Sequence, residues 1–146
     1  MWIAIDYGKV CVGLAVSGPC GLTTAPAGTL HYPGKTFLRG KSFIMVEAGV
    51  RNLLEERGGR LQGIVLGDPG EEDEGSRYLR VRIRALGALL ARVFEVPVFY
   101  QDEAFSSREA EDGMKASGVR NRSSRLDAVA ACVILRRFLD SGVAQF

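Results

Sequence analysis

The sequence of 146 residues lacks the features that mark membrane, secreted and zinc-binding proteins. It has no apolar run of about 18 residues, and its start has neither the basic flank nor the long apolar core of a signal peptide. Its three cysteines, Cys11, Cys20 and Cys132, are odd in number and widely spaced. This pattern suits neither a disulfide framework nor a Cys-x-x-Cys metal site. We therefore expect a cytoplasmic protein with reduced thiols and no membrane partner.

The net charge is small, and histidine is scarce. A formal net charge of +2 is too small to indicate nucleic-acid binding, because dedicated binders are usually far more basic. From charge alone, the acidic run at 71–74 and the basic stretches at 77–92 and 120–125 favour an ordinary solvated surface. His31 is the only histidine, so carboxylates are the main candidates for metal ligands. The Gly8-x-x-x-x-Gly13 spacing is no phosphate-binding P-loop, because no Lys-Ser/Thr follows it.

Hydrophobic periodicity predicts an α/β fold. The predicted strands are Trp2–Asp6, Val10–Val16, Thr23–Leu30, Gly63–Gly67 and Val96–Tyr100. The predicted helices are Phe43–Arg57, 76–94, a segment from Ser106 or Ser107 to about Ala116, and Ser124–Leu139. His31–Lys41 is predicted to be a loop, because Pro33-Gly34 and Gly40 interrupt any period. The order predicts one domain over 1–146, with a mixed five-stranded sheet: an antiparallel meander first, then crossovers whose helices flank the sheet.

Three carboxylates stand where α/β sheets build their sites. Asp6 ends the first predicted strand, Glu103 follows the last one, and Asp127 lies in the first turn of the final predicted helix. Clustered carboxylates repel one another, so such a site needs divalent cations, and hard oxygen ligands suit Mg²⁺ or Mn²⁺. Two ions about 3.5 to 4 Å apart would activate water for phosphodiester cleavage. The spacing therefore suggests a catalytic metal centre.

Each acid also has a structural interpretation. Asp127 alone is an ordinary acid that stabilises a helix start. Asp102 and Glu103 alone form a surface turn, whereas Asp6 interrupts a buried apolar pattern and is the least ordinary. Asp68 precedes Pro69, which favours a turn-forming role over that of an additional metal ligand.

Five motifs in order resemble the bacterial YqgF/RuvX family over nearly the whole chain. They are Ile5-Asp-Tyr-Gly8, Gly13-Leu-Ala-Val-Ser17, Ile64-Val-Leu-Gly67 with Pro69, Asp102-Glu103 followed by Ser106-Ser107 and Glu109-Ala110, and Asp127-Ala-Val-Ala-Ala131 with Ile134-Leu135. The resemblance implies a ribonuclease H-like fold and a nuclease of pre-16S ribosomal RNA, or a Holliday-junction resolvase. It also implies that Asp6, Glu103 and Asp127 are the catalytic, metal-binding carboxylates, with Asp102 a neighbour.

The sequence departs from the family pattern at three places. Lys9-Val10-Cys11 replaces a Thr-Lys-Arg-like stretch. The usual Gly-Leu-Pro-Leu-Asn motif is Gly67-Asp68-Pro69-Gly70-Glu71 in this sequence, and Ala104 replaces the arginine that usually follows Asp-Glu. The first change loses one basic group and displaces another, and the other two make the pocket more acidic or less able to hold phosphate. Arginines bind phosphates with bidentate geometry, and the candidates for substrate contact are Arg120, Arg122 and Arg125, then Lys9 and Arg108. The arginines at 80, 82 and 84 point in several directions on a helix, so they cannot all face one groove.

Three functions remain open. A monomer-sized site and the resemblance favour a metal-dependent nuclease in 5′-end maturation of pre-16S rRNA. A Holliday-junction resolvase acting on branched DNA would need a two-fold homodimer, because paired cuts need paired sites. A catalytically weakened nucleic-acid-binding module would explain the departures at Lys9, Asp68 and Ala104.

Overall fold

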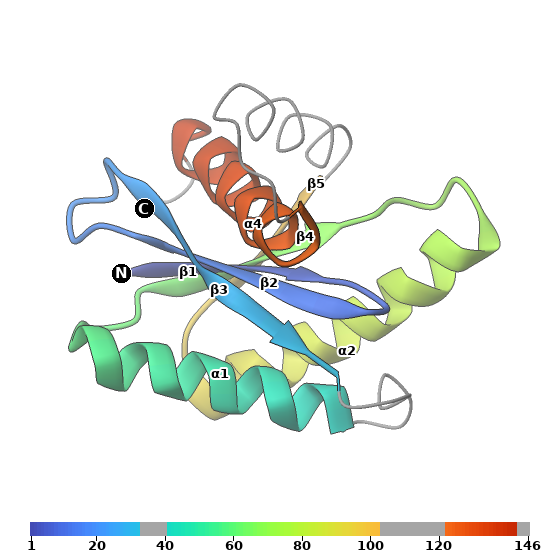
Figure 1. The fold of residues 1–146 in the computed structure, drawn as a ribbon, viewed down its shortest axis with the longest axis horizontal. Helices are drawn as coiled ribbons and strands as arrows, with labels where there is room; N and C mark the ends of the chain where they lie inside the picture. The colour runs from blue at the N-terminus through green and yellow to red at the C-terminus, as the bar shows by residue number, and fades with distance from the viewer. Residues whose placement is uncertain (33–40, 103–121, 143–146) are drawn as a thin grey trace.

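A five-stranded mixed sheet forms the centre of the chain (Figure 1). The computed structural model describes residues 1–32, 41–102 and 122–142. The strands are β1 (Trp2–Tyr7), β2 (Cys11–Ser17), β3 (Thr24–His31), β4 (Gly63–Asp68) and β5 (Val98–Asp102). They lie in the order β3-β2-β1-β4-β5; β1, β2 and β3 pair antiparallel, whereas β4 pairs parallel with both β1 and β5. This is the predicted meander followed by crossovers.

Helices cover both faces of the sheet. Figure 1 shows α1 (Lys41–Arg57) and α2 (Glu74–Phe94) on one face and α4 (Arg122–Asp140) on the other. Since β1 is covered on both sides, its first four residues are buried and apolar, and β4 is likewise buried over its first five residues. The carboxyl ends of β1 and β4 therefore follow directly on buried, apolar strand residues.

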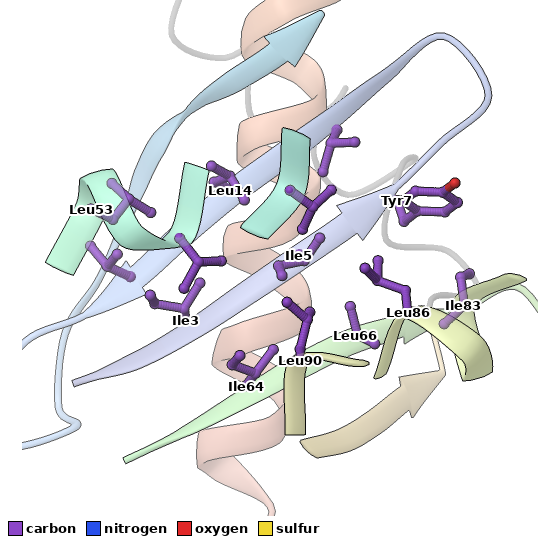
Figure 2. Close-up of a cluster of buried hydrophobic side chains, with 14 residues drawn as sticks. Ile3, Ile5, Tyr7, Leu14, Leu53, Ile64, Leu66, Ile83, Leu86 and Leu90 are labelled. Carbon is purple, nitrogen blue, oxygen red and sulfur yellow. The ribbon is translucent and has the colours of Figure 1, made fainter. Parts of the chain in front are cut away.

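Alternate residues of β1 point to opposite faces, as the period of a strand requires. Ile3, Ile5 and Tyr7 belong to the core cluster formed with α1 and α2, and Figure 2 shows them in a row along the strand, with Tyr7 at its end. Trp2 and Ala4 belong to the second cluster, formed with α4. The alternation places Asp6 on the α4 face.

The α4 face is packed by aromatic rings at the end of the sheet away from Asp6. Trp2 and Phe138 have ring centroids 5.0 Å apart, and Phe99 lies 5.0 Å from Phe138 and 5.9 Å from Trp2. Such a cluster of large apolar side chains fixes α4 on the sheet. The other end of α4 is thereby held over the carboxyl end of β1.

The predicted elements in the described part are confirmed, with shifted ends. β5 begins at Val98 rather than at residue 96, since Pro97 has no N–H to donate to the ladder. The helix predicted over 76–94 begins at Glu74, because the Asp73 carboxylate accepts a hydrogen bond from the backbone N–H of Ser76 at 2.6 Å and caps the helix. The final helix begins at Arg122, two residues before the predicted Ser124.

Two predictions lie partly or wholly outside the described residues. The helix predicted from Ser106 or Ser107 to about Ala116 falls within 103–121, which the structure does not describe. Of the predicted loop, His31 belongs to β3, Lys41 belongs to α1, and 33–40 lie outside the described part. Among the helices that the structure does describe, none has the length and apolar character needed to cross a membrane.

Candidate active site

Asp6 lies opposite a glycine that brings the last helix close. In the antiparallel pairing of β1 and β2, Asp6 is the partner of Gly13. A Cβ atom built on Gly13 would overlap the carbonyl group of Asp127 and would lie 2.9 Å from the backbone nitrogen of Ala128. No side chain fits between β2 and α4 at this point. The absence of a side chain at Gly13 therefore lets Asp127 approach Asp6, although the two acids lie near opposite ends of the sequence.

The thiol of Cys11 makes the second contact between β2 and Asp127. Cys11 lies on the same strand as Gly13, two residues earlier, and its Sγ donates a hydrogen bond to Oδ2 of Asp127 at 2.5 Å. Burial raises the pKa of this thiol to about 12, and the hydrogen bond and negative charge of Asp127 and the charge of Asp6 add to the rise. A thiol with such a pKa stays protonated at neutral pH. Asp6, Cys11 and Asp127 thus form one cluster, which we call the acid pair with its thiol.

The position of Asp127 in α4 corrects the helix-start interpretation. We predicted that Asp127 would lie in the first turn, but α4 begins at Arg122 and has no acidic residue in its first turn. The stabilisation of an acid by the helix dipole falls off within that turn. The prediction was wrong because the helix extends two residues further toward its N-terminus than the sequence pattern indicated. The surroundings of Asp127 are set by its contacts with Cys11 and Gly13, and not by the dipole at the helix start.

Asp68 lies on the other face of the sheet and forms ion pairs with α2. Its Oδ2 lies 3.0 Å from Nη2 of Arg84 and 3.3 Å from Nε of Arg80, and its Oδ1 accepts a hydrogen bond from the backbone N–H of Gly70 at 2.9 Å. The last contact is the side-chain turn expected of an Asp before proline. The structure therefore favours the turn-forming interpretation of Asp68. Asp102 is exposed and pairs with Asp68 across β4 and β5.

Tyr7, next to Asp6, belongs to a buried polar network on the face of α1 and α2. Its hydroxyl lies 2.8 Å from Oγ of Ser42, and Arg82 donates to it from Nε and Nη2 at 3.3 Å. Arg82 thus points to Tyr7, whereas Arg80 and Arg84 point to Asp68. This confirms that the arginines at 80, 82 and 84 do not share one direction.

The candidate substrate residues divide into three groups. Lys9 is exposed in the turn between β1 and β2, and its Nζ would lie 3.2 Å from a Cβ on Gly75, at the start of α2. The pKa of the nearby Asp73 carboxyl is lowered, chiefly by the hydrogen bonds from Ser76 and to a smaller extent by Lys9. Arg108 and Arg120 lie outside the described residues, as does the predicted catalytic residue Glu103. Arg122 and Arg125 belong to the first turn of α4, and their side chains are outside the described part.

The donor chemistry of the acid pair fits a hard divalent cation. Asp6 and Asp127 offer carboxylate oxygens, which Mg²⁺ and Mn²⁺ prefer, and the Cys11 thiol keeps its proton. Within 1–32, 41–102 and 122–142 no group of three or more His, Cys, Asp or Glu side chains is arranged to hold a metal ion. The third predicted ligand, Glu103, follows the last described residue of β5 in the sequence.

Sequence reasoning missed Cys11 and Gly13 as parts of the site. A glycine inside an otherwise apolar strand is a signal of a close backbone approach, and Gly13 stands between Val12 and Leu14. This signal does not identify which segment approaches. Cys11 carries no signal in the sequence, because its partner Asp127 lies 116 residues away.

Comparisons with known proteins identify the family and the fold of the chain. A family model named RuvX and described as "Holliday junction resolvase" matches residues 1–141. Proteins named "Putative pre-16S rRNA nuclease" from Chlorobium luteolum and Porphyromonas gingivalis are 34% and 33% identical to this chain, over 94% and 95% of it and 92% and 95% of their own lengths. The solved structure of Thermus thermophilus RuvC in complex with a Holliday junction substrate superposes with a TM-score of 0.60 at 14% identity, covering 96% of this chain and 95% of that one. The likeness shows a RuvC-like ribonuclease H fold, as the sequence predicts.

Proposed function

Because the chain belongs to the RuvX family, we propose that it is a metal-dependent nuclease that hydrolyses phosphodiester bonds in nucleic acid. The observation that carries this proposal is the meeting of Asp6 and Asp127 at the carboxyl end of β1. A bare glycine and a protonated thiol bring these carboxylates from distant segments to one end of the sheet. A divalent cation is the ligand that two carboxylates at one site suit best.

Asp6 and Asp127, with Glu103 as the third ligand, would hold Mg²⁺ or Mn²⁺. When bound, these cations supply activation of the attacking water and charge neutralisation at the leaving oxygen. Asp6 contributes a carboxylate fixed on a buried strand, and Asp127 contributes one on a helix that packs against the same sheet face. The thiol of Cys11 keeps its proton and orients Oδ2 of Asp127. Rigid support of this kind sets the distance between the two acids.

The substrate class that we favour is the precursor of 16S rRNA, cut at its 5′ end to leave 5′-phosphate and 3′-hydroxyl ends. The names of the relatives from Chlorobium luteolum and Porphyromonas gingivalis support this substrate. We assign the phosphate contacts to five basic residues, since guanidinium and ammonium groups bind phosphate without reading sequence. These residues are Lys9, Arg108, Arg120, Arg122 and Arg125.

A second candidate is a resolvase that cuts four-way DNA junctions as a homodimer. The description of the matching family model favours it. Symmetrical cutting requires two sites related by a two-fold axis. The solution mass of the protein bound to a junction therefore separates this candidate from a nuclease that acts as a monomer.

The experiment compares cleavage of three labelled substrates: a precursor 16S leader, a four-way DNA junction and single-stranded DNA. Each is incubated with Mn²⁺, Mg²⁺ or EDTA, and Asp6→Asn serves as the control variant. Metal-dependent cutting of the leader by the wild type, lost in Asp6→Asn, is the expected result. Symmetrical cutting of the junction would favour the resolvase over the rRNA nuclease. An unimpaired Asp6→Asn variant, or no cutting of any substrate, would contradict the proposal and favour a binding module that has lost turnover.

A further inference from the structure

The outer surface of α2 carries a groove lined by arginines that the proposed chemistry does not use. A hollow of about 540 Å³ is bounded by the residues Glu71, Arg77, Arg80, Val81 and Arg84. Three of them, Arg77, Val81 and Arg84, follow the spacing i, i+4 and i+7, which puts them on one face of a helix. We call these five residues the arginine groove.

Two of the three arginines of the groove, Arg80 and Arg84, are held in place by their partners. Asp68 binds Nε of Arg80 and Nη2 of Arg84, and Glu71 binds Nη1 of Arg80 at 2.5 Å. Arg84 also stacks over the ring of Tyr100, with its guanidinium carbon 3.8 Å from the ring centroid. Among the five groove residues and Asp68, three guanidinium groups stand against two carboxylates. Guanidinium groups fixed in this way lose less conformational freedom when an anion binds.

Arg77 is the arginine most available to a ligand. It is exposed, and it has no acidic partner within the described ranges of the chain. One turn further along α2 lies Val81, an apolar residue that is 69% exposed. An unpaired guanidinium beside an exposed apolar side chain suits a ligand with both anionic and apolar parts.

The groove lies at the same edge of the sheet as the acid pair. The parallel register of β1 and β4 pairs Ile5 with Leu66, so Tyr7 is level with Asp68, which holds two of the arginines. Figure 1 shows the turn between β1 and β2 beside α2, and Lys9 in that turn lies against Gly75. A polymer that passes over this turn from Asp6 would meet Lys9 first and the arginine groove next.

We propose that the arginine groove binds the phosphodiester backbone of the substrate strand beside the cleaved bond. This inference rests on the proposed nuclease function. Arg77 donates to a phosphate, and Val81 contacts the adjoining sugar or base. Because phosphate contacts carry no sequence information, the groove fixes the register of the strand on the enzyme and does not select its sequence. Substitutions there raise KM and leave kcat and metal affinity unchanged.

The test measures binding of a fluorescein-labelled single-stranded RNA by anisotropy in EDTA, between about 50 and 200 mM salt. The variants are Arg77→Ala, Arg77→Lys and, as the matched control, Arg92→Ala, which removes an equal charge from the last turn of the same helix. Thermal melts check that each variant folds. We expect Arg77→Ala to weaken binding about tenfold and to lower the slope of log affinity against log salt by about 0.7. Arg77→Lys keeps the slope, and Arg92→Ala binds like the wild type.

Three results would overturn the inference, and they are distinguishable. If the wild type binds RNA and Arg77→Ala shows the same affinity and salt slope, the groove carries no phosphate and the nuclease proposal stands. If Arg92→Ala weakens binding as much as Arg77→Ala, overall charge explains the effect and the groove has no special role. A wild type that binds neither RNA nor single-stranded DNA at low salt would contradict the proposed function together with the inference.

Discussion

Asp68 and Asp127 are both acids at one edge of the sheet, but they lie on opposite faces and have opposite kinds of partner. Asp68 accepts from two guanidinium groups and a backbone N–H, and its side chain is only 14% exposed. Asp127 accepts from a neutral thiol and has a second carboxylate, Asp6, nearby. The first arrangement is neutralised within the protein. The second places two carboxylates around a thiol that stays protonated, a donor set that suits a divalent cation.

The contrast separates structural from functional acids by their partners. A carboxylate satisfied by arginines gains little from a metal ion, because binding the ion would break its ion pairs with Arg80 and Arg84. A carboxylate beside a second carboxylate gains attraction to the ion and loses repulsion. By this criterion the α4 face holds the candidate metal centre, and Asp68 on the α2 face is a structural acid.

The largest expected effect is that of Asp127→Asn on activity. We expect metal-dependent cleavage to fall by more than about a hundredfold, since even changes to groups that only orient metal ligands cost about 10- to 100-fold. The free energy of unfolding should stay the same or rise, because one of two repelling charges is removed. Cleavage rates and urea unfolding measured on the same preparation check both. A loss of activity that is accompanied by a loss of stability would contradict this account.

Gly13→Ala should come next in size. The new methyl group would overlap the carbonyl of Asp127 and push α4 away from Asp6, so we expect a fall of about 10- to 100-fold in activity and a destabilisation of about 1 to 3 kcal/mol. Gly59→Ala is the matched control, because a Cβ there lies at an ordinary 3.6 Å from Cε of Met1. Equal activity of the two glycine variants would show that the close approach at Gly13 is irrelevant to the site.

Asp68→Asn should lower stability and leave activity nearly unchanged, the opposite of what we expect for Asp127→Asn. Two arginines lose the charge of their partner, so we expect a destabilisation of about 1 to 2 kcal/mol in urea unfolding. Turnover at saturating substrate should remain within a few-fold of the wild type. A complete loss of metal-dependent cleavage would assign Asp68 to the metal centre after all.

The sheet and the acid at its edge were predictable, whereas the neighbours of that acid were not. Strands β1 and β4 are buried on both faces, so they appear in the sequence as continuous apolar runs, and Asp6 is conspicuous because it interrupts such a run. The start of α4 and the face on which Asp68 lies depend on local capping and on strand register, which periodicity does not specify. The contacts of Asp127 with Cys11 and Gly13 are tertiary and join distant segments, so composition and spacing do not contain them.

The smallest expected effect concerns the thiol. Because the pKa of Cys11 is raised from its ordinary value near 9 to about 12 in the folded protein, the folded state keeps a proton that the unfolded state releases above pH 9. The contribution of Cys11 to stability is therefore fully present below pH 9 and declines as the pH rises from 9 toward 12. Cys11→Ser should remove this part of the decline in urea unfolding. An identical pH dependence in the two proteins would contradict the raised pKa.

The most direct test of the central claim is a titration of Mn²⁺ followed by electron paramagnetic resonance, with the wild type, Asp127→Asn and Asp68→Asn compared side by side. We predict that the wild type and Asp68→Asn bind Mn²⁺ with similar affinity and that Asp127→Asn binds at least about tenfold more weakly. Unchanged affinity in Asp127→Asn, or a loss of binding confined to Asp68→Asn, would contradict the assignment of the acid pair as the metal centre.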